Sequence, residues 1–491
     1  MTTMKNVITT RLSLLLAVLL ATAPLAASTP RDTSAWMNET PEQPAVVLVQ
    51  GATVWTSGPD GILENADVLI KAGKISKVGQ GLKAPQDAVV IDGTGKHVTP
   101  GLIDAHSHSA IIGGVNEFSN VTTAEVRIAD VVNSDAIAIY RELAGGLTVA
   151  NQLHGSANSI GGQNAVMKLR WGATPEEMMF KGAPEGIKFA LGENPKQSNF
   201  FNRENPRYPT TRAGVERSIR ERFEAARDYQ KAWEAYEKDG SEVPPRRDLQ
   251  LEAMVEIMTG ERLVHAHSYR ADEIIMLARV GEEFGFTIAS YQHVLEGYKV
   301  ADEIAAVNAG ASTFSDWWAY KYEVVDAIPH NGAIMWDRGV VVSFNSDSDE
   351  LSRRMNTEAA KAVRYGGVPE DEALKFVTLN PAIQLGIDEW VGSLEAGKDA
   401  DFVVWSGHPL STYTVCEQTW IDGRKYFDLE DDRQAREDLD AERLALMEKV
   451  RAASESDSDD SEEGSPSELP AYLTAQSHDE FCRAHDDDRT R

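Results

Sequence analysis

Cysteine is almost absent from this sequence, since only Cys416 and Cys482 occur among 491 residues. A disulfide-stapled scaffold is therefore excluded, because such folds depend on several cysteine pairs. A thiolate-rich metal site is excluded as well, so any bound metal must be held by histidine and carboxylate ligands. We expect both cysteines to be unpaired thiols.

Positive charge is also scarce. The chain has 48 Lys and Arg residues against 77 Asp and Glu residues, which gives a net charge of −29. Nucleic acids and anionic membrane surfaces need a clustered basic face, so neither is expected as a partner. Much of the acidic excess follows Phe427, and the part before it is closer to an ordinary globular composition.

The apolar run Leu12–Ala23 is too short for a membrane-spanning helix. Lys5 and Arg11 precede it, and the small residues Ala26–Ser28 follow it. This order is typical of a secretory signal peptide, here residues 1–28, and predicts a periplasmic or secreted protein. The cleavage region contains no cysteine, so stable membrane anchoring is not expected.

Two patterns of predicted strands divide the rest of the chain. Residues 101–387 alternate short β-branched runs with helical stretches, which predicts a parallel sheet covered by helices. About eight such units fit there, close to the ~250 residues of a (β/α)₈ TIM-like barrel. The predicted strands are Leu147–Gln152, Gly186–Leu191, Arg262–Ala266, Thr287–Tyr291, Ala311–Phe314 and Val340–Phe344.

Strands without intervening helices are predicted at both ends. Residues 45–100 and 388–428 are expected to pair into one small composite β-sandwich domain beside the barrel. The later part includes predicted strands at Val391–Leu394 and Asp401–Trp405. A charged helix is predicted over Thr211–Asp239. Residues 429–491 begin as a charged helix and continue into an acidic, largely disordered tail.

The segment Val98–His108 ends in the pair His106 and His108. Residues two apart in a strand face the same side, so both imidazoles project together. At the C-terminal end of a first barrel strand they could reach one cation. The sequence therefore predicts a metal site here.

Further ligand candidates follow later strands. His267 ends one predicted strand and His293 ends the next, while His265 faces the same side as His267 and could replace it. Asp347 closes the apolar run Val340–Asp347, and a carboxylate there could bind metal and accept a proton from water. Asp349 is a competitor but lies further into the loop.

These motifs together resemble the amidohydrolase superfamily, particularly its imidazolonepropionase-like and prolidase-like members. The resemblance covers about Val46 to Phe427 and rests on Pro100–His108, His267, His293, Asp347, Thr378–Ala382 and Gly392–Val404. It implies a metal-dependent hydrolase of a C–N bond, with one or two divalent ions. Zinc is the expected ion.

In the family a fourth-strand residue often bridges two metals, as either a glutamate or a carboxylated lysine. This sequence offers both within Gly186–Pro195. We favour Glu193, because it needs no modification and follows the predicted strand. Lys188 lies deeper, where prolidase-like members carry the modified lysine, and stays as the alternative.

The resemblance also implies a mechanism. The metal would activate a water and polarise the scissile carbonyl, and Asp347 would pass the proton to the leaving nitrogen. His154 and His265 are candidates to stabilise charge on the carbonyl oxygen. Tyr269, Arg270 and Trp317-Trp318 are candidates for contact with a small-molecule substrate, with Arg270 holding a carboxylate or pairing with Asp272 or Glu273.

Two other functions stay open. One is a deaminase that acts on an N-heterocycle with the same ligands. The other is a non-catalytic scaffold that kept the fold, which we disfavour because every expected ligand position is filled.

Overall fold

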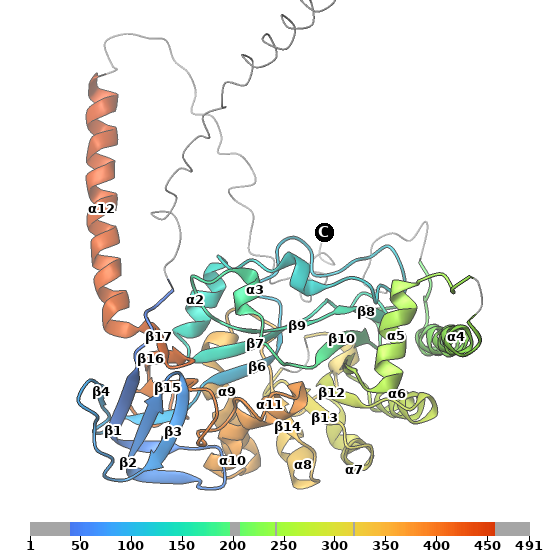
Figure 1. The fold of residues 1–491 in the computed structure, drawn as a ribbon, viewed down its shortest axis with the longest axis horizontal. Coiled ribbons are helices and arrows are strands. Elements are labelled where there is room, and N and C mark those ends of the chain that lie inside the picture. The colour runs from blue at the N-terminus through green and yellow to red at the C-terminus, as the bar shows by residue number, and fades with distance from the viewer. Residues whose placement is uncertain (1–39, 197–206, 241–242, 318–319, 457–491) are drawn as a thin grey trace, which may run out of the picture. The chain divides into compact units, whose positions relative to one another are not determined.

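The computed structural model describes residues 40–196, 207–240, 243–317 and 320–456, and Figure 1 shows their arrangement. The predicted signal peptide, Trp318, Cys482 and the predicted disordered tail after Ser456 lie outside the described residues.

One sheet contains strands from both the beginning and the end of the chain. Its strands follow the order β17-β16-β15-β5-β1-β2-β3, and β4 pairs with β1. Figure 1 shows the blue strands of the N-terminal part beside the orange-red strands β15 and β16. The strands are β1 (Val46–Trp55), β2 (Ile62–Lys71), β3 (Lys74–Gly79), β4 (Val89–Asp92), β5 (His97–Pro100), β15 (Phe402–Trp405), β16 (Cys416–Ile421) and β17 (Arg424–Asp428).

Alternating side chains give this sheet two apolar faces. In β15, Phe402 and Val404 belong to a core cluster formed within the sheet, whereas Val403 and Trp405 belong to the larger core of the helical part. Successive residues of a strand point to opposite faces, so four consecutive apolar residues serve two cores. The buried Trp405 Nε1 donates to Thr99 Oγ1 at 2.9 Å, which leaves the indole nitrogen satisfied.

The remaining strands form two further sheets, with orders β14-β13-β12-β11-β10-β8 and β6-β7-β9. Strands β6 and β7 are parallel, and so are β10 to β14. Their bounds are β6 (Leu102–Ser107), β7 (Leu147–Gln152), β8 (Ile160–Gln163), β9 (Ala165–Lys168), β10 (Glu185–Ala190), β11 (Arg262–Ser268), β12 (Ile288–His293), β13 (Gly310–Thr313) and β14 (Val342–Phe344).

Two strands within residues 160–168, where no strand was predicted, depart from the predicted parallel arrangement. Strand β9 pairs antiparallel with β7, and β8 pairs antiparallel with β10. A parallel connection needs a crossover of a dozen or more residues, and the 12 residues between β7 and its partner β9 already contain β8, so no crossover helix fits there. The chain therefore turns back, and only Asn164 separates β8 from β9.

Hydrogen bonds join the two sheets at both edges. At one edge the Asp347 backbone N–H donates to the His106 carbonyl oxygen at 3.1 Å. At the other edge Asn164 donates from its backbone N–H to the Gly186 carbonyl oxygen at 3.2 Å and from its side-chain amide to Asn151 Oδ1 at 2.5 Å. The C-terminal ends of β6, β11, β12 and β14 consequently meet in one place.

Helices accompany these strands, and α6, α7 and α8 pack against β12, β13 and β14 (Figure 1). The prediction of a helix over 211–239 is confirmed by α4. None of the described helices combines the length and apolarity needed to cross a bilayer. The α-helices are α2 (Ile137–Leu143), α3 (Pro175–Met178), α4 (Arg212–Asp239), α5 (Leu249–Thr259), α6 (Ala271–Phe284), α7 (Ala301–Ala306), α8 (Asn331–Asp337), α9 (Met355–Gly366), α10 (Glu370–Lys375), α11 (Leu379–Leu385) and α12 (Leu429–Ser456).

The strand predicted at Val391–Leu394 is not formed. These residues make bends, and the Leu394 backbone N–H donates to the Thr56 carbonyl oxygen at 2.8 Å. The segment is apolar because Val391 and Leu394 are buried, not because it pairs in a sheet.

Candidate metal centre

His106 and His108 lie at the end of β6 with defined ring orientations. His106 Nδ1 is 3.1 Å from Gln292 Oε1, and His108 Nδ1 is 2.7 Å from the Leu153 carbonyl oxygen. Both partners are acceptors, so each Nδ1 carries the proton and each Nε2 presents a lone pair. The two Nε2 atoms are 3.3 Å apart. The outer hydrogen bonds thus aim two nitrogen lone pairs at one point.

Asp347 follows β14 and brings a carboxylate to the same point. Its Oδ1 is 3.3 Å from His108 Nε2 and 3.6 Å from His106 Nε2. Burial raises the pKa of this carboxyl, but the positive charge of nearby Lys188 favours the ionised form, and the pKa lies below its usual value. Asp347 is therefore ionised at neutral pH. One oxygen of Asp347 and one nitrogen of each histidine lie within 4.8 Å of one another.

His267 and His293 complete the cluster from β11 and β12. The His293 ring centroid is 4.4 Å from that of His106 and 4.9 Å from that of His267, and His293 Nε2 is 3.7 Å from Asp347 Oδ2. Burial lowers the pKa of His293 to about 3 and that of His267 well below its usual value, so both rings are neutral.

The ring nitrogens of His267 and His293 have no hydrogen-bond partner among the described residues, and neither has Asp347 Oδ1. Buried polar atoms are nearly always hydrogen-bonded, so several unpaired acceptors in one place are exceptional. His293 and Asp347 also adopt left-handed backbone angles, with φ of 68° and 47°. Strain of this kind concentrates at functional sites. These residues fit a divalent cation.

Lys188, not Glu193, lies beside this cluster. Lys188 is fully buried in β10, and its Nζ is 3.1 Å from His106 Nε2. Glu193 is partly exposed beyond the strand, with its Oε1 3.7 Å from Lys321 Nζ. These contacts therefore favour Lys188 over Glu193, because Lys188 reaches His106 from within β10, whereas Glu193 lies beyond Ala190, the last residue of the strand, and its carboxylate faces Lys321.

The two histidines considered for the carbonyl oxygen are held by other groups. His154 accepts from the Glu117 backbone N–H at Nε2 and donates from Nδ1 to the Gly155 carbonyl oxygen, both at 2.9 Å. It has no proton left to donate, so that role is corrected. His265 lies two residues before His267 in β11, and its Nδ1 is 2.9 Å from Ser290 Oγ.

Tyr269 and Arg270 have different surroundings. The Tyr269 ring is 4.5 Å from the His267 ring, and its hydroxyl accepts from the Tyr320 hydroxyl at 3.0 Å. Arg270 instead binds Asp272 through Nε at 3.0 Å and Nη2 at 3.2 Å. Of the two alternatives predicted for Arg270, the structure shows the pairing with Asp272, which occupies its Nε and Nη2 donors.

An aromatic wall beside the histidines was not predicted as such. Phe314 stacks on His293 with ring centroids 4.8 Å apart, and Trp317 stacks on Phe314 at 4.0 Å. Gln292, which orients His106, was also missed. The sequence signals were weak: Phe314 follows a strand, and Gln292 is a polar neighbour of His293 at a strand end.

The family model described as "Amidohydrolase family" matches residues 97–426, which is more than half of the chain. The chain belongs to the amidohydrolase family. It is therefore a hydrolase that acts on C–N bonds, of a metal-dependent family with a TIM-barrel fold of mixed α/β content.

Three relatives show how far the similarity extends. Amidohydrolase tasK of Hapsidospora irregularis is 29% identical over 426 residues, which are 78% of this chain but 43% of that protein. The imidazolonepropionase of Thermoplasma acidophilum is 27% identical over 362 residues, 70% of this chain and 83% of that one. The crystal structure of an amidohydrolase from Thermotoga maritima MSB8 matches with a TM-score of 0.72 at 35% identity, over 78% of this chain and 100% of that one.

Proposed function

We propose that this amidohydrolase is an exported, zinc-dependent enzyme that cleaves the C–N bond of a cyclic amide, an amide or a dipeptide-like substrate. Two observations support the substrate class: the aromatic wall beside the histidines, and the imidazolonepropionase among the similar proteins. The residues predicted to form the signal peptide support export. The sheets and helices support a (β/α)₈ barrel with a composite β-domain as the architecture.

One observation carries the proposal of a metal centre. The lone pairs of His106 and His108, the unpaired nitrogens of His267 and His293, and the ionised Asp347 face one another inside the protein. Electron-rich groups this close repel one another unless a cation compensates them, and the Lys188 ammonium, 3.1 Å from His106 Nε2, marks a place where positive charge is favoured. These five residues would hold the ions, and Lys188, in carboxylated form, would bridge them.

When bound, a divalent ion lowers the pKa of water and polarises a carbonyl oxygen. The chain's own residues transfer the proton, stabilise the developing charge and exclude bulk water. Asp347, ionised at neutral pH, accepts the proton of the attacking water and returns it to the leaving nitrogen.

The Tyr269 hydroxyl accepts a hydrogen bond from the Tyr320 hydroxyl and keeps its own proton, because burial raises the pKa of Tyr269 well above its usual value. It donates to the oxygen on which charge develops. Phe314 and Trp317 keep bulk water away from one side.

The replacement Asp347→Asn tests this function. We expect turnover of amide and dipeptide substrates to fall by about 10²-fold or more, the scale of a lost general base, while the variant stays folded. Product analysis separates the two chemistries: release of an amine or amino acid supports the proposal, and release of ammonia from an N-heterocycle favours a deaminase. Unchanged turnover in the variant would refute the role of Asp347.

A further inference from the structure

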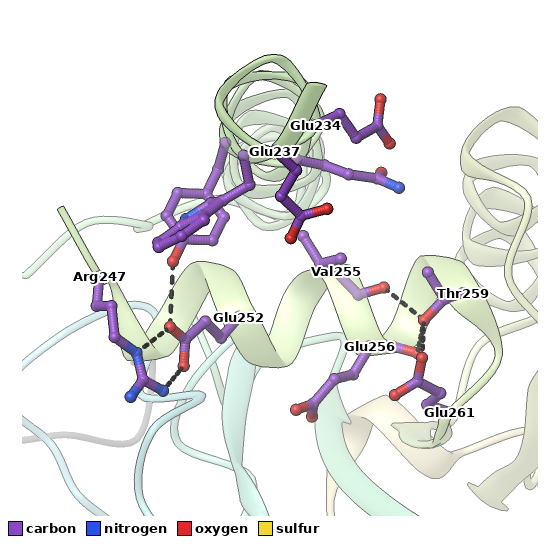
Figure 2. Close-up of a pocket in the computed structure, with 11 residues that line it drawn as sticks. Glu234, Glu237, Arg247, Glu252, Val255, Glu256, Thr259 and Glu261 are labelled. Carbon is purple, nitrogen blue, oxygen red and sulfur yellow. Dashed lines mark hydrogen bonds and ion pairs between the residues drawn. The ribbon is translucent and has the colours of Figure 1, made fainter. Parts of the chain in front are cut away.

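A solvent-open cavity lies between α4 and α5, well away from the metal centre, and Figure 2 shows its lining. Its volume is about 470 Å³, within the usual range of small-molecule sites. Glu261 in its wall directly precedes β11, whose other end carries His267. At ~3.3 Å per strand residue the two are roughly 16 Å or more apart, so this cavity is not part of the catalytic site.

Most of the charge in the cavity wall is negative. Arg247 is the one cation among the lining residues, and Glu252 binds it through both carboxylate oxygens, at 2.7 and 2.6 Å (Figure 2). Glu256 is bound in turn by Arg262, at 2.6 Å. In each of these two ion pairs the positive charge compensates the negative charge of the carboxylate.

Three further carboxylates have no such partner. Among the described residues, Glu234, Glu237 and Glu261 form no ion pair, and Glu261 accepts only a hydrogen bond from Thr259 Oγ1 at 3.2 Å. In Figure 2, Glu234 and Glu237 project from α4 on one side, and Glu261 lies past the end of α5 on the other. Uncompensated like charges around one cavity create a negative potential that favours a cation.

Aromatic and aliphatic groups share the cavity with these carboxylates. Tyr229 and Trp233 line it from α4, with ring centroids 6.2 Å apart, and Val255 lines it from α5. The Tyr229 hydroxyl donates to Glu252 Oε1 at 3.1 Å, which fixes that ring. Aromatic faces attract ammonium groups, and their edges and Val255 offer contact area for methylene groups.

We propose that this cavity binds a small, linear aliphatic oligoamine at a site separate from the catalytic centre. The three unpaired carboxylates match ammonium groups, and the rings match the methylene chain between them. A hydrated metal ion would match the negative charge but would make no use of the aromatic rings, and a basic peptide is the alternative that the titration below separates from an oligoamine.

Isothermal titration of the full chain with spermidine tests the proposal. We expect saturable binding that the triple replacement Glu234→Gln, Glu237→Gln and Glu261→Gln weakens at least tenfold. The matched control replaces Glu221, Glu224 and Glu303 by Gln, which removes the same charge from exposed positions outside the cavity and should leave binding within twofold. Trp233→Leu, which keeps every charge, should weaken binding several-fold.

Three results would overturn the proposal. Equal weakening by both triple variants would show that only net charge matters. Displacement of spermidine by an equal concentration of Mg²⁺ would show a mere counterion effect. Tighter binding of trilysine than of spermidine would assign the surface to a peptide partner. Asp347→Asn should bind spermidine like the parent, which keeps this test independent of the proposed catalysis.

Discussion

Replacing Lys168 by methionine should destabilise the protein strongly, because this lysine joins β9 to the loops around the terminal sheet. Lys168 is 1% exposed, and its Nζ lies 2.8 Å from Asp399, 3.1 Å from Asp401 and 2.6 Å from Asp422. Methionine keeps the length of the side chain but leaves these carboxylates without their buried cation. Removing one partner of a buried ion pair costs about 3–5 kcal/mol, and we expect a loss of that size.

Lys74→Met is the matched control, because Lys74 also pairs with Asp399 but its side chain is 51% exposed. An exposed ion pair contributes at most about 1 kcal/mol. Equilibrium urea denaturation at pH 8 should therefore separate the two variants by about 2 kcal/mol or more.

The difference should also depend on pH. Burial raises the pKa of Asp401 to about 6, although Lys168 opposes the shift. The folded state therefore binds a proton more readily than the unfolded state between about pH 4 and 6, and protonation in that window relieves the uncompensated charge. The defect of Lys168→Met should be smaller at pH 5 than at pH 8. Equal, small losses for Lys168→Met and Lys74→Met would refute this reasoning.

The other predictions concern the metal centre. Lys188→Ala should remove most activity and lower the metal content by one ion per chain. Glu193→Gln should leave the activity and the metal content within a few-fold of the parent. The opposite result would favour Glu193 as the bridging residue. Acid should destabilise the metal-free protein. Burial lowers the pKa of His293 to about 3 in the folded state, so below about pH 6.5 the unfolded state binds more protons than the folded state does. Stability measured by urea denaturation should then fall from pH 7 to pH 4, and a flat profile would contradict the burial of a neutral, unpaired imidazole.

Much of this architecture could be predicted from hydrophobic patterning. The strand containing Leu147–Gln152 was predicted with its observed bounds, and the other five predicted barrel strands were found to within three residues at each end. Such strands are recognisable because their interior is continuously apolar. The reversed strand at 160–168 was missed, because the direction of a strand depends on the length of its connections and not on its own residues.

The histidine ligand candidates could also be located, since strand ends in this fold converge on one face. The choice between Lys188 and Glu193 could not be made reliably. It depends on where β10 ends, and strand ends are the least certain part of a sequence-based prediction. The pairing of Arg270 with Asp272 likewise depends on side-chain conformation at the start of α6.

Elemental analysis of the purified chain tests the central claim most directly. We expect about two divalent ions per chain, and none in the double variant His106→Ala and His108→Ala, whose folding is checked by circular dichroism. One ion per chain would support a metal centre but reject the bridging role of Lys188. A folded parent chain that retains no divalent ion after reconstitution with zinc would contradict the account.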